Sequence, residues 1–257
     1  MPYLVNNGIR IHYGVYGNGR PVVLLHGGTV SFEHNYAKYG WIERLNASGL
    51  QAVGLDFRGH GESDKPHDTE SYGTSNLADD VRALLDHLKL VQPALIAYSI
   101  GTVVALHLLQ VSPPRFNRAA LVATGDGLVG FPPYTLGRVL PPLALVLDRT
   151  EYPNDLPHHL ANYWNFVHAT NGDREALRAL SRASYPPLSV EQAAGIGTPV
   201  LVVSGEMDLV LGQGQRLAGG LGQGTYFEVP GADHFSLAAD ADVQAAVVSF
   251  ITAQSPE

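Results

Sequence analysis

Short apolar segments that alternate with helical patterns limit the fold of this chain more than any other feature. Residues 76–90 show the helical pattern, with apolar side chains recurring along one face. The apolar segments after residue 50 are 51–57, 93–99, 117–124, 198–205 and 225–230, and a closing helical pattern covers 237–253. Such alternation predicts an α/β fold, in which a mostly parallel, doubly wound sheet is covered by helices on both sides.

The N-terminal segment predicts a different local arrangement. Asn7-Gly8 and Asn18-Gly19 each lie between β-rich runs, and an Asn-Gly pair in that setting is the strongest short-range signal for a β-hairpin. The strand expected over residues 21–26 is apolar on both faces, as strands deep within a sheet are. We therefore expect N-terminal antiparallel hairpins ahead of the parallel strands.

The alternation stops between residues 125 and 190. Eight of the 17 prolines fall there, and its helical patterns, over 160–170 and 173–184, are not separated by strands. A structureless connection of that length is uncommon in a compact domain. We predict an α/β core formed by residues 1–124 and 191–257, with residues 125–190 as a helical cap or lid inserted over one end of the sheet.

Polar residues follow the predicted strands where those strands end. Open parallel sheets bind their ligands outside the carboxyl ends of the strands, so these residues are expected to meet. They are His26-Gly27-Gly28-Thr29, residues 56–63 (DFRGHGES), Ser99, residues 205–208 (GEMD) and residues 231–234 (GADH). A serine, an acid and a histidine thus occur at strand ends in the chain order Ser, Asp, His.

These motifs together resemble the α/β-hydrolase fold family. The resemblance runs from LLHGG through DFRGHGES, AYSIG and GEMD to GADH, and only residues 125–190 fall outside it, where that family varies. AYSIG departs from the family's G-x-S-x-G pattern because Ala97 replaces the first glycine. The tight turn requires a small side chain at that position, and Ala97 adds one methyl group, so we interpret the departure as tolerated.

The resemblance implies a role for three residues. Ser99 would be the nucleophile, His234 the base that removes its proton, and Asp208 the acid that orients the imidazole. Asp126, which follows the preceding strand, is an alternative acid because some relatives carry the acid one strand earlier. Asp233 is a weaker rival, since it is adjacent to His234 in the chain.

The resemblance also implies a site for the oxyanion and for the substrate. The expected oxyanion donors are the backbone N–H groups of Gly28 and Ile100. We expect the substrate pocket to include Thr29, Tyr98, Phe131, Trp164 and Phe166. In the motif loops, His26 and His60 are expected to orient the chain by hydrogen bonds, and Asp56 and Arg58 to form an ion pair.

A serine at the nucleophile position argues against haloalkane dehalogenases and epoxide hydrolases, which need a carboxylate nucleophile. The sequence therefore predicts a carboxylesterase-like serine hydrolase that cleaves a small ester through an acyl-enzyme. Lactone hydrolysis, carbon–carbon bond hydrolysis and cofactor-free perhydrolysis are alternatives on the same three residues. A non-catalytic small-molecule receptor of the same fold is the alternative from another class.

Composition narrows the partners and the location. The formal charge is −8 and basic residues are few and scattered, so nucleic acid is not an expected partner. With no cysteine, disulfides and thiolate chemistry are excluded. We expect a small-molecule ester or acyl substrate, no metal or other cofactor, no membrane span, no leader peptide and a cytoplasmic location. A homo-oligomer is compatible with the sequence.

Overall fold

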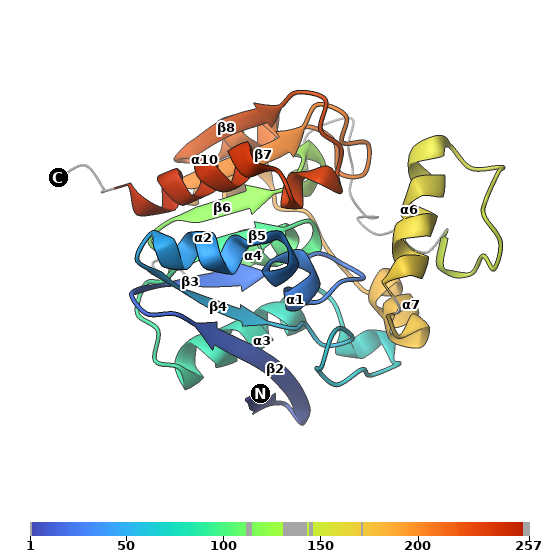
Figure 1. Cartoon of the computed structure of the whole chain (residues 1–257), viewed down its shortest axis with the longest axis horizontal. Helices are drawn as coiled ribbons and strands as arrows, with labels where there is room; N and C mark the ends of the chain where they lie inside the picture. The colour runs from blue at the N-terminus through green and yellow to red at the C-terminus, as the bar shows by residue number, and fades with distance from the viewer. Residues whose placement is uncertain (1, 112–114, 131–142, 144–145, 171, 254–257) are drawn as a thin grey trace.

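An eight-stranded sheet organises the chain in the computed structural model, which describes residues 2–111, 115–130, 143, 146–170 and 172–253 (Figure 1). The strands run in the order β1-β2-β4-β3-β5-β6-β7-β8, and every pairing from β4 to β8 is parallel. The bounds are β1 Tyr3–Asn6, β2 Ile9–Tyr16, β3 Arg20–Leu25, β4 Leu50–Leu55, β5 Ala94–Tyr98, β6 Ala119–Val122, β7 Val200–Gly205 and β8 Gly224–Val229. The mostly parallel α/β sheet predicted from the sequence is confirmed.

Helices cover both faces of this sheet because side chains alternate along each strand. In β3, Val22 and Leu24 pack with the helices on one face, whereas Val23 and Leu25 pack with those on the other. The first face carries α2 (Trp41–Ala47) and α10 (Ala241–Thr252), and the second carries α3 (Thr74–His87) and α4 (Ile100–Val111). The sheet is therefore buried on both faces, which explains why its central strands are apolar throughout.

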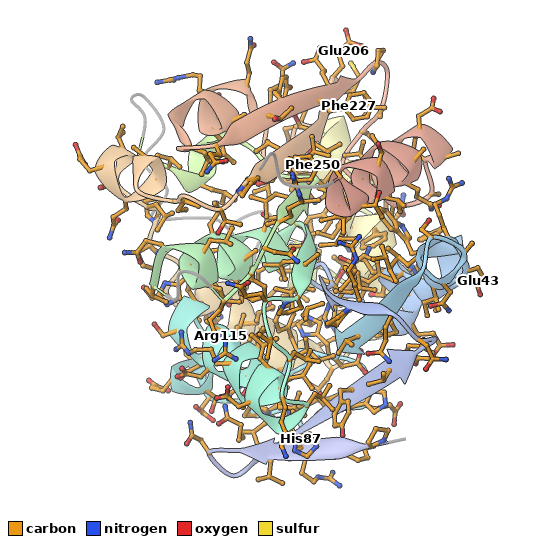
Figure 2. The ribbon with its side chains drawn as sticks, turned by 90° about the vertical axis from the view of Figure 1, so that its left-hand side faces the viewer. Glu43, His87, Arg115, Glu206, Phe227 and Phe250 are labelled. Carbon is orange, nitrogen blue, oxygen red and sulfur yellow. The ribbon has the colours of Figure 1, made fainter. Side chains whose placement is uncertain are left out.

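The outer helix α3 follows its predicted amphipathic pattern. Leu77, Val81 and Leu84 are fully buried against the sheet. At the end of the helix, His87 lies beside the sheet (Figure 2), where its Nε2 is 3.0 Å from the hydroxyl oxygen of Tyr13 in β2. This contact joins α3 to the antiparallel edge of the sheet.

Only the first of the two predicted hairpins forms. β1 and β2 pair antiparallel around Asn7-Gly8, both of which have positive φ. The prediction of a second hairpin, at Asn18-Gly19, is wrong, because β2 pairs antiparallel with β4 while β3 lies on the far side of β4. β3 is apolar on both faces, and helices cover both of them at its central place in the sheet.

The segment from 125 to 190 contains short helices and one isolated bridge between Val129 and Leu188 in its described part. The named helices in its described part are η3 (Asp126–Leu128), α6 (His158–Ala169) and α7 (Arg174–Arg182), and α8 (Val190–Ala194) begins at its last residue. Figure 1 shows α6 and α7 beyond the carboxyl ends of the strands. The remaining short helices are α1 (Phe32–Asn35), η1 (Ala37–Tyr39), η2 (Thr69–Ser71), α9 (Gln215–Gly220) and η4 (Ser236–Ala238).

Candidate active site

Ser99 occupies a tight turn between β5 and α4. Its φ is +51°, a left-handed conformation that residues other than glycine seldom adopt. Gly101 lies so close to β3 that a Cβ placed on it would be 2.5 Å from the carbonyl oxygen of Leu25. Strand and helix therefore meet with no room for a side chain at 101. This turn holds Ser99 at the carboxyl end of β5.

Ser99, His234 and Asp208 form one hydrogen-bonded chain. The Oγ of Ser99 is 2.9 Å from Nε2 of His234, and Nδ1 of His234 is 2.8 Å from Oδ2 of Asp208. Since a carboxylate can only accept, Nδ1 carries the hydrogen and Nε2 is free to accept from the serine. His234 and Asp208 are both buried. The arrangement allows proton transfer from Ser99 to His234.

The carboxylate of Asp208 is stabilised as an anion. Burial alone would raise its pKa, but the charge of His234, the hydrogen bond to its ring and the N–H groups of Leu211 and Val210 favour ionisation. Those two N–H groups donate to Oδ1 over 3.1 and 2.9 Å. The pKa of Asp208 consequently lies below its usual value. Asp208 is thus ionised where it contacts Nδ1 of His234.

The two alternative acids lie elsewhere. Asp126 accepts a hydrogen bond from the N–H of Leu217, at the start of α9. Asp233 accepts from the N–H groups of Phe235 and Ser236 in its own turn. Of the three acids considered from the sequence, the structure brings Asp208 to His234 and neither of the others.

The residues that carry the two expected oxyanion donors, Gly28 and Ile100, lie close together. A Cβ placed on Gly28 would be 3.8 Å from Cγ2 of Ile100. Within the described chain, the backbone N–H groups of Gly28 and Ile100 donate no hydrogen bond to another residue. The neighbouring N–H groups of Gly27 and Thr29 donate to Asn35 and His60. Both free N–H groups lie at the loop and helix start nearest Ser99, where an oxyanion would form.

Two buried histidines hold this loop, as expected. Nε2 of His26 accepts from the N–H of Phe57 at 2.9 Å, and its Nδ1 lies 2.7 Å from the carbonyl oxygen of Gly27. Nε2 of His60 accepts from the N–H of Thr29. Burial, and next the charge of His26, lower the pKa of His60 to about 3. His60 is therefore neutral at physiological pH and remains an acceptor.

The expected ion pair between Asp56 and Arg58 does not exist. Oδ2 of Asp56 is 2.8 Å from Nδ1 of His12, on β2. Arg58 instead donates through Nε and Nη2 to both carboxylate oxygens of Asp80, on α3, each over 2.7 Å. Asp56 and Arg58 lie two positions apart in one loop, yet each pairs with a side chain from a different and distant part of the chain.

A small cavity opens above Ser99. Tyr98 and Phe166, two of the residues expected in the substrate pocket, line this cavity, and the hydroxyl of Tyr98 donates to the carbonyl oxygen of His234. Sequence reasoning missed further lining residues, namely His34, Asn35, Tyr39, Tyr163 and Phe235. Phe235 directly follows the GADH motif, and this position could have identified it as a lining residue from the sequence. The positions of the others depend on how α1, η1 and α6 pack against the site.

Three pocket predictions have other outcomes. Trp164 does not line the cavity: its Nε1 donates to the carbonyl oxygen of Arg149 and its ring stacks on His168. Thr29 is 2% exposed and lines a neighbouring cavity instead. Phe131 lies outside the described residues. Neighbouring positions on α6 point in different directions, which separates Trp164 from Phe166.

Across the described ranges, no cluster of three or more histidine, aspartate or glutamate side chains could hold a metal ion. None of the helices described is long and apolar enough to cross a membrane.

The chain is similar to known proteins in sequence and in structure. Residues 20–189 match the family model for the alpha/beta hydrolase fold. A curated relative, AB hydrolase superfamily protein YisY of Bacillus subtilis, is 37% identical over 90 residues, which are 35% of this chain and 32% of that one. The chain thus spans about a third of the length of that relative.

Two solved structures are similar over nearly the full chain. An enol-lactonase from Burkholderia xenovorans superposes with a TM-score of 0.72 at 27% identity, covering 98% of this chain and 100% of that one. Est816, described as an N-acyl homoserine lactone degrading enzyme, superposes with a TM-score of 0.74 at 25% identity, covering 97% and 100%.

Proposed function

This chain belongs to the α/β-hydrolase fold family, and we propose that it is a serine hydrolase that cleaves a small carboxylic ester through an acyl-enzyme on Ser99. The observation that carries the proposal is the hydrogen-bonded chain from Ser99 through His234 to Asp208 at the base of an aromatic cavity. Each residue has the chemistry that nucleophilic acyl transfer requires.

Acylation begins at the serine. As the Oγ of Ser99 attacks the ester carbonyl, its proton passes to Nε2 of His234. The carbonyl oxygen becomes an oxyanion, which accepts hydrogen bonds from the N–H groups of Gly28 and Ile100. When the tetrahedral intermediate collapses, the C–O bond to the alcohol breaks and the imidazolium protonates the departing oxygen. The acyl group is left on Ser99.

Deacylation repeats these steps with water. Neutral His234 takes a proton from a water molecule, whose oxygen attacks the acyl carbon, and the same two N–H groups stabilise the new oxyanion. The proton then returns to Ser99 as the acid leaves. Throughout, the anionic Asp208 fixes the tautomer of His234 and stabilises the imidazolium.

The shape of the cavity supports a modest acyl or aryl group. Rings of Tyr163, Phe166 and Phe235 contribute apolar surface, with Phe166 and Phe235 only 4.7 Å apart between ring centroids. Since α6 supplies two of these rings from beyond the strand ends, we propose that residues 125–190 act as the cap over the site.

The test is a panel of acyl esters, lactones and amides, assayed with the wild type and Ser99→Ala. We expect the wild type to hydrolyse short esters and the variant to lose at least about 10³-fold in kcat, because the residual rate comes from binding and oxyanion stabilisation alone. Equal rates in both proteins would contradict the proposal. Binding without hydrolysis across the panel would favour a small-molecule receptor.

Lactone hydrolysis is the second candidate. One structural neighbour, at 27% identity, is described as an enol-lactonase, and another, at 25%, as an N-acyl homoserine lactone degrading enzyme, and both align over their full length. A lactone is a cyclic ester, so the same residues would open it, with the alcohol remaining attached to the acyl group. In the panel, a lactone with higher kcat/KM than its open-chain ester would favour this candidate.

A further inference from the structure

One wall of the cavity above Ser99 is polar, and its polar groups come from one short helix. His34 and Asn35 are the last two residues of α1, and both line the cavity. The surface contributed by α6 and by the loop after β8 is aromatic. A purely hydrocarbon acyl chain would match the aromatic surface and leave the polar wall without a partner.

The amide of Asn35 presents a hydrogen-bond donor to this cavity. The residue is 4% exposed, and its Oδ1 accepts from the N–H of Gly27 at 2.8 Å. That bond fixes the orientation of the amide and leaves Nδ2 to donate, yet no residue in the described ranges accepts from it. In those ranges, three threonine hydroxyls are the side-chain polar groups that are both inaccessible to solvent and without a hydrogen-bond partner, and Nδ2 of Asn35 is not among them. Nδ2 therefore reaches open space, and the cavity is the space that Asn35 lines.

His34 adds a second polar group beside it. Its ring meets Phe166 and Tyr39 edge-on, with centroids 6.2 and 6.4 Å apart. Within the described part of the chain, neither ring nitrogen is hydrogen-bonded. Burial, and next the charge of Lys38, lower the pKa of this histidine. The neutral ring offers one N–H donor and one acceptor.

The amide also lies close to the reacting serine. The point where a Cβ on Gly27 would stand is 3.4 Å from Oδ1 of Asn35 and 3.4 Å from Cβ of Ser99. A group bonded to Ser99 therefore has Asn35 within reach along its first few atoms.

We propose that His34 and Asn35 make this wall a specificity site for acyl groups that carry an acceptor oxygen beyond the scissile carbonyl, such as alkoxy-, hydroxy- or oxo-acyl groups. The inference rests on the proposed hydrolase function. A buried N–H loses its water when substrate enters, and an alkyl chain gives nothing in return. A site built to hydrogen-bond one substrate group discriminates against the analogue that lacks it.

The test compares esters that differ by one oxygen in place of one methylene. The p-nitrophenyl esters of methoxyacetate and butyrate form one pair, and those of 3-methoxypropionate and valerate form another. Each kcat/KM is divided by the rate of alkaline hydrolysis of the same ester, which removes intrinsic reactivity. We expect the wild type to prefer the oxygen-containing ester about fivefold in at least one pair.

Asn35→Asp is the informative variant, because its carboxylate still accepts from Gly27 while the donor becomes an acceptor. We expect it to abolish or reverse the preference. Asn18→Asp adds the same charge at an exposed turn between β2 and β3 and is expected to keep the preference. His34→Phe retains the ring contacts and is expected to reduce it.

Equal normalised kcat/KM in both pairs would overturn the inference. So would a preference that Asn35→Asp leaves unchanged, or a parallel loss on both esters, which would assign Asn35 to the loop alone. Calorimetric binding of the same esters to Ser99→Ala measures selection without hydrolysis. If no ester is hydrolysed, the proposed function fails, while a fivefold ratio of Kd still supports the polar wall and equal Kd values overturn it.

Discussion

Ala97 is the residue at which this chain departs from the G-x-S-x-G pattern of its family. It is fully buried in β5 and pairs with Leu25 on one side and Leu121 on the other. Its methyl group belongs to the core cluster on the α4 face, whereas Gly101 is crowded by backbone. The structure thus shows space for one methyl at 97 and none at 101.

A larger side chain at 97 should disturb the turn that carries Ser99. We expect Ala97→Val to lose most esterase activity and about 1–3 kcal/mol of unfolding free energy, because overpacking displaces the strand. Ala97→Gly should retain activity and lose about 1 kcal/mol or less. Ester hydrolysis and urea unfolding measure both. Equal activity in the two variants would refute the tight-turn explanation.

Residues whose position follows from their own strand could be predicted from the sequence. Ser99, Asp208 and His234 each follow a strand end, and parallel strands bring their ends to one edge. Partners that depend on distant elements could not be predicted. Arg58 finds Asp80 on α3, and Trp164 turns from the cavity that Phe166 enters.

At the scale of elements, the loop over residues 56–63 is tied to α3 by a buried ion pair. The side chains of Arg58 and Asp80 are 5% and 0% exposed, and Asp80 also accepts from Asn6 on β1. The same loop carries His60, whose Nε2 accepts from the N–H of Thr29, next to the proposed oxyanion donor Gly28. The loop therefore contacts α3 through Arg58 and the candidate site through His60.

Removing the charge of Asp80 should destabilise the fold strongly. We expect Asp80→Asn to cost about 3–5 kcal/mol in urea unfolding, because Arg58 is left buried without a counter-charge. The matched control is Asp64→Asn, which removes the charge from a pair whose side chains are 30% and 61% exposed. That change should cost about 1 kcal/mol or less. Similar costs for the two variants would show that burial does not govern the pair.

The observed strand pairing shows that an Asn-Gly turn signal alone does not determine which strands pair. Asn7-Gly8 predicts its hairpin because nothing competes with the two strands it joins. Asn18-Gly19 has the same signal, but β3 lies between β4 and β5 in the centre of the sheet, where helices bury both of its apolar faces. The burial of a whole strand outweighs the preference of one turn.

The folded molecule encloses two histidines whose pKa values are lowered by burial. His26 and His60 are nearly or fully inaccessible, and burial lowers the pKa of both, that of His60 to about 3. An unfolded histidine has a pKa of about 6.5. Below that pH the unfolded chain binds protons that the folded chain does not, so stability falls as pH decreases.

Acid should therefore weaken this fold well before its carboxylates are protonated. His60 alone is expected to cost about 2 kcal/mol between pH 7 and pH 5. His60→Gln keeps an acceptor for Thr29 and removes the titrating group, so its loss over the same range should be smaller. Urea unfolding at both pH values gives each difference within one protein. An equal pH dependence in the two proteins would contradict this account.

Covalent labelling is a direct test of the claim that Ser99 is an activated nucleophile. Native protein is treated with a fluorophosphonate probe, and the modified residue is located by mass spectrometry of the digested chain. We predict stoichiometric labelling on Ser99, with none after denaturation or in Ser99→Ala. An unlabelled Ser99, under conditions in which a control serine hydrolase reacts fully, would contradict the claim.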